Sequence, residues 1–104
     1  MYAVVRRYEG TDMNRQDEMF REVGEGFLPN LAETPGFIGY FFVDAGDGVA
    51  ASIGIFETRE AAEDSTRAAA DYIREQNMQD ILPNPPQVTA GEVRVHKMRA
   101  GVAA

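Results

Sequence analysis

Three side chains of this sequence could act on a proton or an anion: His96, Arg6 and Arg94. Histidine is the only side chain here that, unperturbed, exchanges a proton near neutral pH, so His96 could serve as a general base. Arg6 and Arg94 fall in segments expected to form adjoining strands, where paired guanidinium groups could hold an enolate or a carboxylate. The alternatives are a strand-end histidine in solvent and an ion pair with Glu92 or a sheet-edge arginine. We predict His96, Arg6 and Arg94 as candidate catalytic residues.

Four further side chains could contact a ligand. Tyr72 and Ser65 share the inner stripe of an expected helix and could present hydroxyl groups to a cleft beneath it. Tyr40 and Phe42 alternate along an expected strand and could stack on an aromatic substrate. Core packing is the alternative for Tyr72, and the core of a dimer interface is the alternative for Tyr40 and Phe42. We predict these four as candidate substrate-binding residues.

Composition excludes several classes of partner. The formal net charge is -7, and Arg6-Arg7 is the largest basic cluster, so no cationic surface for nucleic acid is expected. With no cysteine and one histidine, the chain cannot make a thiolate or multi-histidine metal site, and neither a metal nor a cofactor is expected. Apolar runs are too short to cross a bilayer, and the first ten residues do not read as a signal peptide. We therefore expect a cytoplasmic protein with no membrane partner.

The elements that position these residues follow from hydrophobic periodicity. Gly24, Gly26 and Pro29 should kink or shorten the first helix, and Thr58 is the expected N-cap of the second. The expected strands cover residues 2–8, 37–43, 49–56 and 88–98, and the expected helices cover about 14–33 and 58–78. This order predicts one α+β domain over residues 1–98, a ferredoxin-like βαββαβ fold with a four-stranded antiparallel sheet and both helices on one face. Residues 99–104 are expected to fray.

The second strand is apolar on both faces, which has a consequence for assembly. The bare face of the sheet should expose either Phe37, Phe41 and Val43 or Ile38, Tyr40 and Phe42. Monomers rarely expose apolar patches of that kind, and a self-complementary two-fold interface is the commonest way to cover them. We predict a homodimer through the sheet face.

Three segments carry a resemblance to a known family: VVRRY in the first strand, PGFIGY entering the second, and IFETREAA joining the third strand to the second helix. The chain resembles the antibiotic biosynthesis monooxygenase-like members of the dimeric α+β barrel superfamily over nearly its whole length. The resemblance implies a homodimer with a small pocket between helices and sheet in each subunit. The chain has no tryptophan, and its only histidine lies on the last expected strand, so the catalytic residues of the polyketide-oxidising and haem-degrading relatives are not transferred.

The resemblance further implies oxygenation of a quinol or polyphenolic substrate without metal or flavin, as in some relatives. Two other functions remain open from the residues alone. The same cleft could belong to a non-catalytic module that binds or senses a small aromatic ligand, or the chain could be a dimeric accessory protein without a ligand. A fold by itself does not choose between them.

Overall fold

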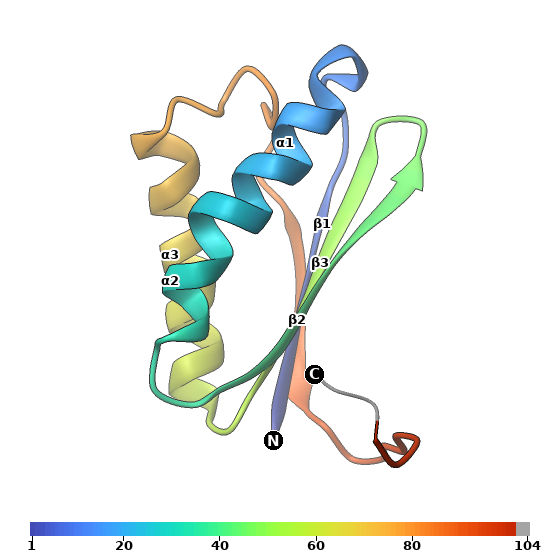
Figure 1. Ribbon diagram of the computed structural model, residues 1–104, viewed down its shortest axis with the longest axis vertical. Coiled ribbons are helices and arrows are strands. Elements are labelled where there is room, and N and C mark those ends of the chain that lie inside the picture. Colours follow the sequence, from blue (N-terminus) through green and yellow to red (C-terminus); the bar gives the residue numbers. More distant parts are fainter. Residues whose placement is uncertain (102–104) are drawn as a thin grey trace.

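The computed structural model describes residues 1–101, and it has a sheet covered by helices on one side only (Figure 1). The expected element order, βαββαβ, is confirmed. The strands are β1 (Tyr2–Tyr8), β2 (Phe37–Gly46), β3 (Val49–Phe56) and β4 (Gln87–Glu92). The helices are α1 (Gln16–Glu22), α2 (Leu28–Ala32) and α3 (Arg59–Glu75).

The sheet has the order β2-β3-β1-β4, and every neighbouring pair is antiparallel. Arg6 of β1 lies opposite Ser52 of β3, and Ser52 lies opposite Phe42 of β2. Three of the four inward residues of β3 are small, namely Ala50, Ser52 and Gly54, and the fourth is Phe56 at the end of the strand. This ferredoxin-like arrangement confirms the predicted fold.

The first helical region is continuous, but its hydrogen bonding changes along its length. A 3-10 turn at Met13–Arg15 leads into α1, and a π-helical turn at Val23–Phe27, here called the π turn, joins α1 to α2. The irregularity predicted for the first helix therefore lies at Gly24 and Gly26. There the helix changes to a wider π-type turn and does not end. Pro29 sits in the first turn of α2, where a missing N–H is tolerated, so the helix continues to Ala32.

Helix α3 lies close against the sheet because its inner face is made of small residues. Ala62, Ser65 and Ala69 are its buried positions. The Thr58 hydroxyl accepts a hydrogen bond from the Ala61 amide at 3.1 Å, which confirms the predicted N-cap. The helix ends at Glu75. Asn77, two residues later, has a positive φ of 55° and turns the chain back.

The last strand is shorter than predicted. Strand β4 ends at Glu92, and residues 93–99 are not part of the sheet, so the predicted strand 88–98 is wrong over its second half. Residues 93–99 alternate between polar and apolar side chains but have no neighbouring strand to pair with in the described chain. Strand β1 begins at Tyr2, which already lies opposite Glu92. Residues 102–104 of the predicted frayed end lie outside the described residues. No helix in the described part of the chain is long and apolar enough to cross a membrane.

The sheet face away from the helices is apolar and uncovered in the monomer. A β-bulge at Ile38 leaves Phe37, Tyr40 and Phe42 packed against the core, while Ile38, Phe41 and Val43 are exposed. Neither of the two sets expected from strict alternation is therefore correct, because the bulge inserts one residue and changes the phase of the strand. The apolar surface extends across the sheet from Phe41, which is 60% exposed, to its register partner Ile53 and from there to Val5.

Candidate functional site

Arg6 is the most unusual side chain of the interior. It lies on the helix-facing side of β1, and only 1% of its surface is exposed. Its Nη1 donates hydrogen bonds to Ser65 Oγ at 3.1 Å and to Thr66 Oγ1 at 3.2 Å. The Ser65 hydroxyl in turn donates to the carbonyl oxygen of Ala62 at 2.6 Å. One edge of the guanidinium is thereby fixed to α3.

The other edge of the Arg6 guanidinium lacks a hydrogen-bond partner in the described part of the chain. Its Nε and Nη2 are buried without a hydrogen-bond partner among residues 1–101, and so is the hydroxyl of neighbouring Ser52. No carboxylate of the described chain forms an ion pair with Arg6. Buried charges in proteins are normally paired, because an unpaired one loses its hydration without compensation. The structure thus holds an uncompensated positive charge in the core.

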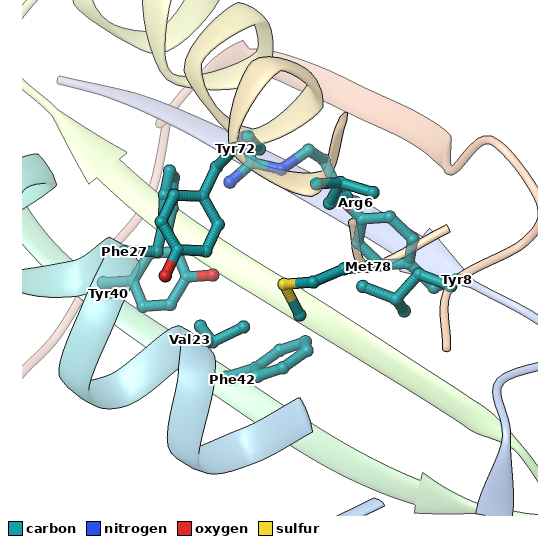
Figure 2. A pocket seen from close by; sticks show the side chains of 11 residues that line it. Arg6, Tyr8, Val23, Phe27, Tyr40, Phe42, Tyr72 and Met78 are labelled. Atoms are coloured by element: carbon teal, nitrogen blue, oxygen red, sulfur yellow. The ribbon is translucent and has the colours of Figure 1, made fainter. Parts of the chain in front are cut away.

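A cavity adjoins this charge, and we call it the arginine cavity. Figure 2 shows the aromatic side chains around it, with the Tyr40 and Tyr72 hydroxyl groups on one side and Met78 across its middle. Its volume is about 20 Å³, room for about one water molecule. Its lining comprises Arg6 and the aromatic residues Tyr8, Phe27, Tyr40, Phe42 and Tyr72, together with Val23, Ala69, Ile73, Met78 and Leu82.

The arginine cavity marks the boundary between two parts of the core. Phe27 and Ala69 belong to one buried cluster, and Tyr8, Met78 and Leu82 belong to the other. Arg6 is almost completely buried beside this boundary, and the gap next to it is lined largely by aromatic rings.

The tyrosines of the cavity remain protonated well above neutral pH. Burial raises the pKa of Tyr8 and of Tyr40, and the positive charge of Arg6 opposes that rise in both cases. Hydrogen bonding with the Arg6 side chain also lowers the pKa of both tyrosines, so their hydroxyl groups lie beside the guanidinium. Even so, Nε and Nη2 have no hydrogen bond of normal geometry within residues 1–101. The site combines a fixed cation with neutral hydroxyl groups.

Tyr72 stands at the helix side of the cavity and is held by an acidic partner. Its hydroxyl donates to Glu22 Oε2 at 2.8 Å, and its ring centroid lies 5.4 Å from that of Phe27. Desolvation first, and then the hydrogen bond to the Glu22 carboxylate and its charge, raise the pKa of Tyr72 to about 12. A Cβ on Gly26 would clash with the Tyr72 hydroxyl oxygen, so this contact needs glycine at that position.

Most of the predicted site residues come together around this cavity. Arg6, Tyr40, Phe42 and Tyr72 line it, and Ser65 accepts a hydrogen bond from Arg6. Their roles in binding or catalysis stay predictions. In this geometry Arg6, and not a histidine, is the charged residue at the centre of the site.

His96 and Arg94 lie elsewhere. Both are exposed and follow the end of β4, and Arg94 approaches only Glu92, at 4.0 Å. The expected pairing of Arg94 with Arg6 is wrong, because the residue of β4 opposite Arg6 is Val88. Neither side chain lines the arginine cavity in the monomer.

Several lining residues were not predicted. Tyr8 is two positions from Arg6 on the same strand, so strand periodicity alone could have added it. Val23 and Phe27 fall within the first expected helix, at about residues 14–33, which the sequence did not link to the site. Met78 gives no sequence signal, because it enters the cavity from beyond the end of α3.

Among residues 1–101, no three histidine, aspartate or glutamate side chains are grouped so that they could hold a metal ion. The cationic character of the arginine cavity also makes it a poor metal site. The candidate ligands of this site are therefore anions and aromatic molecules.

Comparison with known proteins identifies the fold. No family model matches the sequence, and no curated protein is significantly similar to it. Among solved structures, the monooxygenase from the gene ActVA-Orf6 of Streptomyces coelicolor, in complex with the ligand nanaomycin D, matches with a TM-score of 0.73 at 16% identity, covering 95% of this chain and 92% of that one.

Two proteins from Nitrosomonas europaea are also similar. NE2512, of unknown function, has a TM-score of 0.74 at 18% identity, covering 96% and 95% of the two chains. A candidate antibiotic biosynthesis monooxygenase has a TM-score of 0.70 at 13% identity, covering 91% of this chain and all of that one. The chain therefore has the fold of the antibiotic biosynthesis monooxygenase-like proteins, as the sequence resemblance implied.

Proposed function

We propose that this protein is a small monooxygenase that oxidises a quinol or polyphenolic substrate in the arginine cavity without metal or flavin. The observation that carries the proposal is the ring of aromatic side chains around a buried cation, in a fold shared with a monooxygenase solved with a bound ligand. Aromatic rings bind planar aromatic molecules by offset or edge-to-face contacts.

The substrate itself can supply the electrons for such a reaction. In an anthrone-type substrate, the reacting methylene carbon loses its hydrogens and becomes a carbonyl carbon. One oxygen atom of dioxygen enters that carbonyl, and the other leaves as water. The chain's part is to orient the substrate, exclude bulk water and stabilise the electron-rich form that reacts with oxygen.

Entry of a substrate requires side chains to move. The cavity of about 20 Å³ is too small for a polyphenol as it stands. Met78, whose side chain lies across the cavity in Figure 2, is unbranched and can adopt other rotamers. Its displacement would join the space it occupies to the cavity.

Oxygen uptake tests the proposal. Purified protein is incubated with a panel of quinols and anthrones under air, and consumption of oxygen is compared with the uncatalysed rate and with an anaerobic control. We expect acceleration with at least one member of the panel, and product carrying one oxygen atom from labelled dioxygen. Uptake at the background rate throughout, together with ligand-induced thermal stabilisation, would instead identify a binding module.

A further inference from the structure

We propose that the arginine cavity binds its ligand as an oxyanion, a deprotonated phenol or enol whose negative oxygen faces Nε and Nη2 of Arg6. This inference deepens the proposed function by naming the charge state of the ligand. It rests on the proposed function only for the class of ring system that we expect. Binding of the anion itself does not require catalytic turnover.

The buried charge of Arg6 is without a countercharge in the described chain. A guanidinium stays protonated in proteins, so Arg6 cannot escape the cost of burial by losing its proton. Its Nη1 is occupied by Ser65 and Thr66, while Nε and Nη2 are without partners in the described chain. These two donors lie along one edge of the planar group, the fork geometry that receives an oxyanion.

The groups around Arg6 are hydrogen-bond donors without negative charge. The Ser52 hydroxyl is buried and has no partner of normal geometry within residues 1–101, and Ser52 lies opposite Arg6 in the register of β1 and β3. The nearby Tyr8 and Tyr40 are held in their neutral, hydrogen-donating form, because burial raises the pKa of each. All of these groups can donate to an anion, and none of them brings a negative charge that would compete with it.

The carboxylate of Glu22 is bound to a residue of the cavity lining but not to Arg6. Glu22 accepts a hydrogen bond from the Tyr72 hydroxyl at 2.8 Å and forms no ion pair with Arg6 within the described residues. An incoming oxyanion would supply the missing countercharge, with its ring system against Phe42 and Tyr40.

A matched pair of coloured probes tests the inference. Lawsone, a hydroxynaphthoquinone with an acidic enol, is an anion at neutral pH, and its methyl ether has the same rings without an ionisable proton. Binding is followed by the visible absorption of the probe and by calorimetry. We expect lawsone to bind at least about tenfold more tightly than the ether at neutral pH, the equivalent of one charge-assisted hydrogen bond. Lowering the pH through the titration of the lawsone hydroxyl should remove that preference. Equal affinity for the two probes would overturn the proposal.

Arg6 variants separate anion binding from a structural role. Arg6→Met keeps the length of the side chain and removes the charge. If Arg6 serves only to fasten β1 to α3, the unliganded variant should melt at a lower temperature than the wild type. If it is retained for an anion, the variant should melt at an equal or higher temperature and should lose the preference for lawsone. Arg6→Lys, which keeps the charge but not the fork, should retain part of the preference. A folded Arg6→Met variant that still prefers lawsone contradicts the proposal.

The two proposals can fail independently. Selective lawsone binding without oxygen uptake on any quinol leaves the oxyanion site standing and removes the monooxygenase. Oxygen uptake combined with equal binding of lawsone and its ether leaves the monooxygenase standing and removes the oxyanion site.

Discussion

The hydroxyl of Tyr72 reaches Glu22 across the backbone of Gly26, and the hydrogen bond of 2.8 Å joins α3 to the first helical region. The contact is possible because Gly26 has no side chain. It sets the orientation of an aromatic ring that lines the arginine cavity.

Replacing Gly26 by alanine should expel the Tyr72 hydroxyl. Gly24→Ala is the matched control, because nothing lies within 4 Å of a Cβ at that position. Both variants gain similar helix propensity, so their difference reports the clash and the lost hydrogen bond. We expect Gly26→Ala to be less stable than Gly24→Ala by about 1–3 kcal/mol in urea unfolding. Equal stability would show that Tyr72 rearranges without cost.

The carboxylate of Glu22 should also control the ionisation of Tyr72. In Glu22→Gln the negative charge is lost, and the pKa of Tyr72 should fall from about 12 towards the ordinary tyrosine value. Tyrosinate absorbance during alkaline titration measures this change, and Tyr72→Phe identifies the signal. A titration curve unchanged by Glu22→Gln contradicts the assignment.

The raised pKa of Tyr72 makes a signed prediction for stability. Protonated Tyr72 is favoured in the folded state, so its contribution is fully present below the unfolded-state pKa of 10.0 and is lost as pH rises towards 12. Denaturant midpoints should therefore fall over this interval in the wild type and fall less in Tyr72→Phe. The opposite order would mean that the folded state favours the ionised form.

Met78→Ala should open the arginine cavity. Truncation of a buried methionine typically costs about 2–5 kcal/mol, so the variant should melt at a lower temperature. Its affinity for lawsone should nevertheless rise, because the ligand no longer has to displace the thioether. Met78→Leu, with nearly conserved volume, is the control. A folded Met78→Ala variant that binds no better than this control would place the ligand elsewhere.

The uncovered sheet face leads to the proposal that a second copy of the chain packs on it. Phe41→Glu would place a charge in the middle of that interface, opposite Ile53. Light scattering should show a dimer for the wild type and a smaller species for Phe41→Glu. Ala70→Glu introduces the same charge at an exposed position of α3 and should leave the dimer intact. A monomeric wild type at micromolar concentration contradicts the proposal.

The fold was predictable because its signals are local. The strand expected at residues 2–8, the Thr58 cap and the irregular first helical region are each found in the structure. Strand ends and strand phase were less predictable, since they depend on pairing partners. Residues 93–98 alternate like a strand, but beyond the hydrogen bond from the Val93 amide to the Met1 carbonyl they have no strand to pair with among residues 1–101. The bulge at Ile38 follows from the register with β3.

The site was predictable only in part, for a similar reason. Residue type alone made Arg6 and Arg94 equal candidates, but their burial differs. Arg6 is 1% exposed, whereas the side chain of Arg94 is 83% exposed. Burial of a charge is a tertiary property that no single-sequence pattern reports. The same holds for Met78, which reaches the cavity only because the chain reverses after α3.

The π turn has a consequence for which changes the chain can accept. A π turn accommodates one extra residue within a single turn, so the residues after it keep the faces that they would have in a plain α-helix. Deleting one residue from Val23–Phe27 should therefore restore an α-helix and leave Leu31 turned towards the core. Natural variants of this helix should include chains that are one residue shorter here.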